Sequence, residues 1–415
     1  MEQRPPKQMP RSVYLDYQAT TPVDPRVVEA MLPYFGEKFG NAASRSHRWG
    51  SEAEKAVEGA RSKIAALAGA APREIVFTSG ATESDNLAIL GAAEAMSDRG
   101  RHVITVATEH KAVLDPCRRL QERGWRLTVL APNSNGLVDL GAFRTAISAE
   151  TTLVSAMYAN NEIGVIHQIR EIGTLCREKG VVFHCDAVQA FGKVPVNVEK
   201  DQVDLMSVSA HKLYGPKGIG ALFIRRRNPR VALLPQILGG GHERGFRSGT
   251  LNVPGIVAFG EACAICAHEM EHEGRRLRSL RDRLLLRLTS ELPDVRVNGS
   301  IVDRLPNNLN VSFAGIDSEA LLMGMPEIAL STGSACTSAM VEPSYVLRAI
   351  GVPDDLARGS VRFGLGRSTT EEDIEYVADR VIATVQALRA LSPTGGRQTG
   401  ISRRQLVLPE QAPES

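Results

Sequence analysis

Polar side chains that could take part in chemistry occur at the ends of five predicted strands. They are a threonine, a histidine, an asparagine, an aspartate and a lysine: Thr82, His110, Asn161, Asp186 and Lys212. Taken singly, each is explained better by a helix cap or a loop hydrogen bond, because helix starts prefer such residues. Open α/β sheets, however, bind ligands at the carboxyl ends of their strands. We therefore expect these side chains to share one site.

Two of these positions suggest a phosphate and a ring nitrogen as ligands. The segment SGATES, residues 79–84, opens a helix, where free backbone amides and the Thr82 hydroxyl could hold a phosphate. A glycine turn with Ser79 or Thr82 as helix cap explains the spacing alone better. Asp186 ends an apolar strand, where a carboxylate needs a partner such as a protonated pyridine nitrogen. A cap on a following helix, with Gln189 three residues later, fits equally well.

Lys212 has the surroundings of a lysine that forms a Schiff base. It follows a strand of buried character in the segment SAHKLYGPKG, residues 209–218, which contains Gly and Pro turn residues. Desolvation and nearby cations lower the pKa of a lysine and free its amine to attack a carbonyl and to move protons. An exposed loop lysine is the more common alternative.

One cysteine differs from the other five. Cys336 lies among small polar residues, in the segment STGSACTS at 331–338, and this composition predicts an accessible loop. Cys117, Cys176 and Cys185 lie in periodic segments and are expected to be buried. The pair at 263 and 266 has redox or zinc-ligand spacing, but it lies within a predicted helix without a second pair nearby, so we assign it to helix packing.

The order of predicted elements indicates an α/β fold with a second, smaller domain. Residues 74–226 alternate β-rich runs with amphipathic stretches, the pattern of parallel βαβ units. Helices are expected at 52–68, 271–292 and 371–388, and a further strand at 309–313. Predicted domains are an N-terminal arm (1–21) that packs with the small domain, a large domain (22–270), a small domain with the Cys336 loop (271–393) and a mobile tail (394–415). The seven strands expected in the large domain are 75–78, 103–107, 127–130, 153–159, 181–187, 205–210 and 220–225.

Composition and charge argue against several classes of protein. Hydrophobic residues make up 43% and charged residues 23% of the 415 residues, as in ordinary folded proteins. Lys plus Arg (49) nearly balances Asp plus Glu (47), so direct nucleic-acid binding is not expected. No apolar run has the length of a membrane span, and residues 1–12 lack the apolar core of a signal peptide. We expect a cytoplasmic protein with reduced thiols.

Nine segments together resemble the IscS-type cysteine desulfurases, which are related to NifS. These belong to the fold-type-I, class V aminotransferase-like group of enzymes that use pyridoxal 5'-phosphate. The likeness runs from about residue 14 to residue 393. The segments are YLDYQATTPVDPRV, FGNAASRSHR, IVFTSGATESDNLAI, TEHKAVLD, NNEIGV, SAHKLYGPKGIGAL, GGGHERGFRSGT, STGSACTSAMVEPSYVLRA and RFGLGR.

The resemblance implies a role for each site residue. Lys212 forms the Schiff base with the cofactor, Asp186 pairs with its pyridine nitrogen, and His110 stacks on its ring and acts as acid or base. Gln189 contacts the phenolic oxygen, with Asn161 beside it. Arg362 binds the substrate carboxylate, a task that suits a guanidinium fork. The phosphate is held by Ala81, Thr82, Ser209 and His211, with Thr250 reaching in from the other subunit of a homodimer.

The implied reaction converts L-cysteine to L-alanine and leaves a persulfide on Cys336. The lysine freed by the substrate removes a proton, and the Cys336 thiolate attacks the substrate's sulfur. Sulfur then passes to an iron-sulfur scaffold protein of the IscU type and to proteins of transfer-RNA thiolation. Cys336 is also a candidate ligand for an iron-sulfur cluster shared with the scaffold.

Two departures from the family pattern and two rival functions remain. Thr332 stands where the loop commonly has a second Ser, and the tail after residue 393 differs in composition, which puts scaffold docking in doubt. Selenocysteine lyase or small-amino-acid aminotransferase activity would use the same cofactor, but Cys336 argues against both. A silent binding subunit is disfavoured because Lys212, Asp186 and Cys336 are all present.

Overall fold

A seven-stranded sheet forms the centre of the larger part of the molecule. The structure is a computed structural model, and it describes residues 11–332 and 343–391. The strand order is β2-β8-β7-β6-β5-β3-β4, and only β8 runs antiparallel to its neighbours. All seven predicted strands are confirmed. Their bounds are β2 Ile75–Thr78, β3 His102–Val106, β4 Arg126–Leu130, β5 Thr151–Ser155, β6 Val182–Asp186, β7 Leu205–Ser209 and β8 Gly220–Ile224.

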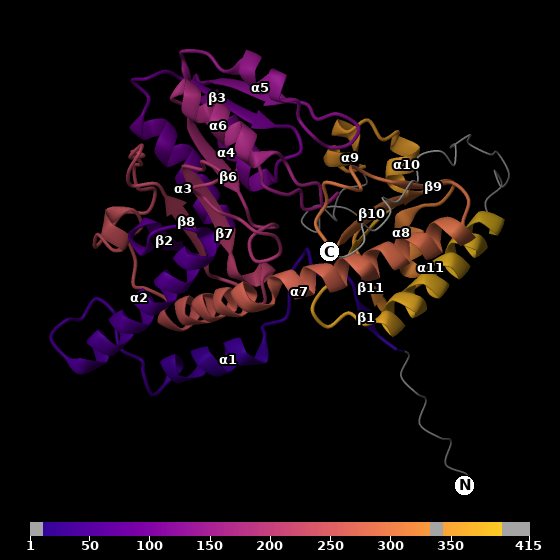
Figure 1. The fold of residues 1–415 in the computed structure, drawn as a ribbon, viewed down its shortest axis with the longest axis horizontal. Coiled ribbons are helices and arrows are strands. Elements are labelled where there is room, and N and C mark those ends of the chain that lie inside the picture. The colour runs from indigo at the N-terminus through magenta and orange to yellow at the C-terminus, as the bar shows by residue number, and fades with distance from the viewer. Residues whose placement is uncertain (1–10, 333–342, 392–415) are drawn as a thin grey trace, which may run out of the picture.

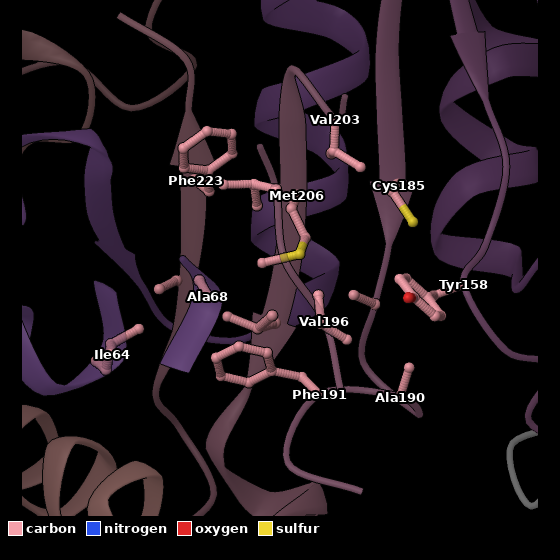
Figure 2. Packing of buried hydrophobic residues seen from close by; sticks show 14 of the residues in the cluster. Ile64, Ala68, Tyr158, Cys185, Ala190, Phe191, Val196, Val203, Met206 and Phe223 are labelled. Atoms are coloured by element: carbon pink, nitrogen blue, oxygen red, sulfur yellow. The ribbon is translucent and has the colours of Figure 1, made fainter. Parts of the chain in front are cut away.

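Helices cover both faces of this sheet (Figure 1). Alternate strand residues pack on opposite sides, as the two-residue period of a strand requires. Ile75 and Phe77 belong to the core under α2, α6 and the first half of α7, whereas Val76 belongs to the core under α3 and α4. Figure 2 shows the first core, with Ile64 and Ala68 of α2 near Phe223. The helices are α2 Arg48–Ala68, α3 Ala81–Ala95, α4 Lys111–Glu122, α5 Leu140–Ala146, α6 Ile169–Lys179 and α7 Val253–Glu291.

The smaller part combines a three-stranded antiparallel sheet with helices. The sheet has the order β12-β10-β9, and its core also includes the second half of α7. Near the N-terminus, β1 pairs with β11 of this part. Strand 309–313 and helix 371–388 are confirmed as β10 and α11. The bounds are β1 Val13–Tyr14, β9 Val295–Val297, β10 Asn308–Phe313, β11 Ile328–Ala329, β12 Ser360–Gly364, α8 Ser318–Met323, α9 Tyr345–Ala349, α10 Asp354–Arg358 and α11 Glu371–Leu391.

Helix α7 runs through both parts as one continuous element of 39 residues (Figure 1). It starts eighteen residues before the predicted 271, because Asn252 accepts a hydrogen bond from the Gly255 amide and caps the helix there. It passes close to α2, since a Cβ on Gly260 would lie only 2.6 Å from the Ala60 Cα. The predicted domain boundary at residue 270 therefore falls inside a helix. By length and composition α7 could span a membrane, but 56% of its apolar window is buried, as in a core helix.

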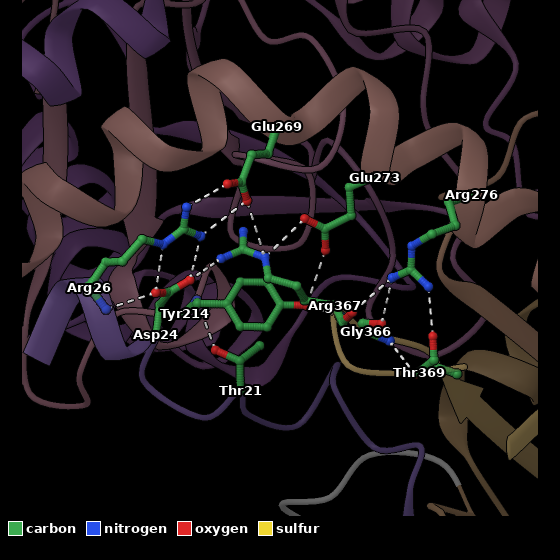
Figure 3. Close-up of polar contacts among 10 residues, drawn as sticks. All are labelled: Thr21, Asp24, Arg26, Tyr214, Glu269, Glu273, Arg276, Gly366, Arg367 and Thr369. Carbon is green, nitrogen blue, oxygen red and sulfur yellow. Dashed lines mark hydrogen bonds and ion pairs between the residues drawn. The ribbon is translucent and has the colours of Figure 1, made fainter. Parts of the chain in front are cut away.

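A network of charges joins the N-terminal arm, α7 and the loop after β12 (Figure 3). Arg367 is its centre: the guanidinium contacts Asp24 at 2.5 Å and Glu273 at 3.2 Å, and lies 4.1 Å from the centre of the Tyr214 ring. Arg26 also binds Asp24, and together the two arginines hold the pKa of Asp24 at about 2. The network fixes the smaller part beside the loop that carries Lys212, since Tyr214 follows that lysine by two residues.

Candidate active site

Ten of the predicted site residues line one cavity of about 440 Å³. It lies where β6 and β7 end, next to the start of α3. Residues from the arm and from β12 close it, so both parts of the molecule contribute walls. The prediction that strand-end residues gather at one site is confirmed for their position; their roles stay predictions. The ten are Ala81, Thr82, His110, Asn161, Asp186, Gln189, Ser209, His211, Lys212 and Arg362.

The start of α3 presents backbone amides to this cavity. Its N-cap is Gly80, which has no side chain to accept from the first turn, so the predicted cap by Ser79 or Thr82 is wrong. The Ser79 hydroxyl instead donates to Glu83 at 2.5 Å. The first amides of a helix have no acceptor within it and carry its positive end, which favours an anion. His211 lines the same cavity, and burial lowers its pKa to about 4, so its ring is neutral at pH 7.

Asp186 presents a buried carboxylate at the end of β6. Its side chain is largely buried, and one oxygen accepts a hydrogen bond from the Val188 amide at 3.0 Å. Burial and the nearby negative charge of Asp85 raise its pKa to about 7. The cap considered for Asp186 and Gln189 does not form, because residues 188–193 form turns and no helix begins there; the Gln189 side-chain nitrogen donates to the Gln18 carbonyl. A cation in the cavity would bring the pKa of Asp186 down and keep it ionised.

Lys212 points into the cavity, so the alternative of an exposed loop lysine is wrong. Its Nζ donates to the carbonyl oxygens of Gln18 and Ala19, each at 2.6 Å. His110 caps α4, and its Nδ1 accepts from the Ala112 amide at 3.1 Å. Burial lowers the pKa of His110 despite the opposing charge of Asp186. The imidazole is therefore neutral at pH 7, with its proton on Nε2.

Arg362 enters the cavity from β12 and is only 1% exposed. Its Nη1 donates to the Asn161 carbonyl at 2.8 Å, and its Nη2 contacts Asp16 at 2.7 Å. Two buried atoms here have no hydrogen-bond partner among the described residues: the Arg362 Nε and the Asn161 Oδ1. Since buried polar atoms are almost always paired, they indicate a site for a polar ligand.

Comparison with known proteins identifies the family. The model of the class-V aminotransferases matches residues 13–377. The chain belongs to this family. It is 57% identical to a protein named cysteine desulfurase IscS from Anaeromyxobacter sp. strain Fw109-5, over 92% of this chain and 94% of that protein. A solved NifS-like protein aligns with a TM-score of 0.84 at 37% identity, over 91% of this chain and 100% of that one. SspA in complex with cysteine aligns with a TM-score of 0.75 at 36% identity, over 85% of this chain and 99% of that one.

The predicted family and fold class are thus confirmed. Class-V aminotransferases depend on pyridoxal phosphate, and the cavity of this member has the groups such a cofactor needs. It offers a lysine amine, a buried carboxylate and helix-start amides, as well as the side-chain amide oxygen of Asn161, which has no partner among the described residues. These donors and acceptors fit the cofactor.

Two predicted site residues are not among those that line the cavity in the described part of the chain. Thr250 is exposed and does not line the cavity of this single chain, so its reach into a second subunit stays a prediction. Cys336 lies outside the described residues. The predictions for the other thiols are confirmed, because Cys117, Cys176 and Cys185 are fully buried. Cys263 and Cys266 are buried in α7.

Sequence reasoning missed a second carboxylate of the cavity. Asp85 of α3 is 1% exposed, and neither of its oxygens accepts a hydrogen bond within the described chain. His184 Nε2 lies 3.5 Å away, but burial lowers the pKa of His184 to about 4, so the ring carries no charge at pH 7. Burial raises the pKa of Asp85 to about 7. An Asp on a helix face shared with Ala88 and Ile89 was the available signal.

Proposed function

We propose that this chain is a pyridoxal-phosphate-dependent cysteine desulfurase that forms a persulfide on Cys336. The observation that carries the proposal is the convergence of Lys212, Asp186 and Arg362 on one cavity. An amine, a buried carboxylate and a guanidinium are what a pyridoxal enzyme needs for its aldehyde, its ring nitrogen and its substrate's carboxylate. The relatives named cysteine desulfurase make cysteine the substrate.

The cofactor would be held by residues around the cavity. The start of α3, Ser209 and His211 would bind its phosphate, and Asp186 would pair with its ring nitrogen. Gln189 would donate to its phenolic oxygen, while Lys212 would bind it covalently. When bound, pyridoxal phosphate supplies an electron sink for the carbon from which a proton is removed. Asp186 stays ionised beside the ring nitrogen, because the cation lowers its raised pKa.

Arg362 orients the substrate. Its Nη atoms already bind the Asn161 carbonyl and Asp16, and these contacts hold the guanidinium plane in place. The Nε, without a partner in the described chain, is free to donate to the cysteine carboxylate. With the substrate so placed, the Lys212 amine removes the α-proton and later returns one. His110 is neutral and its Nδ1 accepts from the Ala112 amide, so its Nε2–H would face the substrate's sulfur as a proton donor.

Sulfur leaves the substrate by attack of the Cys336 thiolate on the substrate's sulfur. A sulfur–sulfur bond forms as the carbon–sulfur bond breaks, and the carbon takes up a proton to give L-alanine. The persulfide sulfur then passes to an iron-sulfur scaffold protein or to proteins of transfer-RNA thiolation. We place this reaction in the cytoplasm and in a homodimer, in which Thr250 completes the partner's phosphate site.

Mass spectrometry of the intact chain tests the proposal. Purified protein is incubated with L-cysteine and pyridoxal phosphate without reductant, and alanine and pyruvate are measured in the same sample. We expect the parent chain to gain sulfur while alanine appears, and Cys336→Ser to gain none. Cys117→Ser is the matched control, since this buried thiol is predicted to play no part. Pyruvate in place of alanine, or sulfur gain in Cys336→Ser, would contradict the proposal.

A further inference from the structure

A second lysine lies behind the wall of the cavity. Lys193 is in the turn after β6, four residues beyond Gln189, and lines a small adjoining cavity with Lys212 and Glu273. No carboxylate of the described residues lies within ion-pair distance of its Nζ. Its Nζ donates a hydrogen bond to the Gln189 Oε1, at 3.2 Å. Burial and the charge of Lys212 lower the pKa of Lys193 to about 7.

That hydrogen bond determines which way the Gln189 amide points. The two ends of a glutamine amide are nearly equal in size and differ only in hydrogen bonding. In the structure the Lys193 Nζ donates to the Gln189 oxygen, and its protonated form can only donate, so Lys193 favours the amide orientation with the oxygen toward it. The Gln189 nitrogen then points the opposite way, and it donates to the Gln18 carbonyl at 3.0 Å. Lys212 donates to the same carbonyl, so the Gln189 N–H groups lie on the side of the reactive lysine.

We propose that Lys193 is a positioning residue that keeps the Gln189 N–H groups directed at the cavity. The inference rests on the proposed function, in which Gln189 donates to the phenolic oxygen of pyridoxal phosphate. One Gln189 hydrogen is used by Gln18, and the second is available to the cofactor. Without Lys193 only the hydrogen bond to the Gln18 carbonyl holds this orientation, and an amide that turned would direct its oxygen at the cavity and repel an anionic oxygen.

The visible absorbance of the bound cofactor reports this orientation directly. A hydrogen bond donated to the phenolic oxygen stabilises its anion and so lowers the pH at which the cofactor loses its proton. We expect Lys193→Met to raise the pH midpoint of the absorbance change by about 0.5 to 1 unit, the size of one hydrogen bond. Lys193→Arg keeps a cationic donor and should restore the midpoint. Lys200→Met, at an exposed lysine of the following turn, is the matched control.

A double-mutant cycle separates positioning from a direct effect of charge. The groups that face Lys193 are Lys212, Cys266, Glu273 and Arg362. None of these four residues is substituted in the variants of the cycle. If Lys193 acts through Gln189, Gln189→Ala should shift the midpoint as much as Lys193→Met, and the double variant no further. Additive shifts would overturn the proposal, as would an unchanged midpoint in Lys193→Met.

Failure of the inference can be told from failure of the proposed function. Protein that binds pyridoxal phosphate through Lys212 shows visible absorbance that Lys212→Ala loses. If the parent chain shows no such absorbance, the proposed function is wrong. If it does and Lys193→Met titrates like the parent, only the inference is wrong. Circular dichroism of Lys193→Met and Lys193→Arg verifies that both variants fold.

Discussion

Replacing Asp85 by Asn should stabilise the cofactor-free protein relative to the parent, and this stabilisation should be larger at alkaline pH than at acid pH. Asp85 is fully enclosed between α3 and the sheet, and its oxygens have no hydrogen-bond partner in the described chain. Ionising it places an uncompensated charge next to Asp186. Asn has nearly the same shape but cannot ionise, so the substitution removes only the charge.

The size of the effect follows from the pKa of Asp85, which burial raises from 3.8 to about 7. Below about pH 3 the residue is protonated in both the folded and the unfolded chain. As the pH rises, the unfolded chain ionises first, so folding stability is lost until the folded residue ionises near pH 7. The full loss is about 4 kcal/mol, of which about 3 kcal/mol falls between pH 5 and pH 8.

Urea unfolding, followed by tryptophan fluorescence at pH 5 and pH 8, measures this difference. The free energy of unfolding of Asp85→Asn minus that of the parent should be larger at pH 8 by about 3 kcal/mol. Asp98→Asn is the control, because this aspartate is exposed in the turn after α3. The free energy of unfolding of Asp98→Asn minus that of the parent should be the same at both pH values. An equal difference at both pH values for Asp85→Asn would refute the assignment of the buried proton to Asp85.

Two further substitutions test buried arginines and their partners. Glu243→Gln should lower the free energy of unfolding by about 3–5 kcal/mol, because it leaves the Arg61 guanidinium buried without its bidentate partner; urea unfolding measures this. The surface change Glu261→Gln should cost less than about 1 kcal/mol, and equal losses would contradict the argument. Arg362→Lys should raise the KM for L-cysteine by about 10- to 100-fold, since it removes the guanidinium fork. An unchanged KM, with unchanged cofactor absorbance, would show that another group binds the carboxylate.

The large sheet and most of its site could be predicted because their signals are local. Each strand is a short apolar run, and the residue at its carboxyl end falls at the ligand-binding edge whatever the details of packing. Asp186, Lys212 and His110 were found in this way. The start of α7 was missed because its first turns, after Asn252, contain small residues and Gly rather than the leucines that mark its second half.

What could not be predicted depends on contacts between distant segments. Arg362 and Asp16 are 346 residues apart, and their pairing exists only once β12 and the arm meet. Lys193 donates to Gln189, which is only four residues away. The orientation of the Gln189 amide, however, also depends on the distant Gln18 carbonyl. The burial of Asp85 likewise arises from packing of α3 on the sheet, which periodicity suggests but does not measure.

The N-terminal arm does more in this structure than pack against the small domain. Its Gln18 and Ala19 carbonyls accept hydrogen bonds from the Lys212 Nζ, and its Asp16 pairs with Arg362. The arm therefore holds the Lys212 side chain in place before the cofactor binds. The Gln18 carbonyl also accepts from the Gln189 amide, and this hydrogen bond does not depend on Lys212. Gln189 thus contacts the arm with one hydrogen and would contact the cofactor with the other, so we expect substitutions at Gln189 to change both the cofactor titration and the hold of the arm on the site.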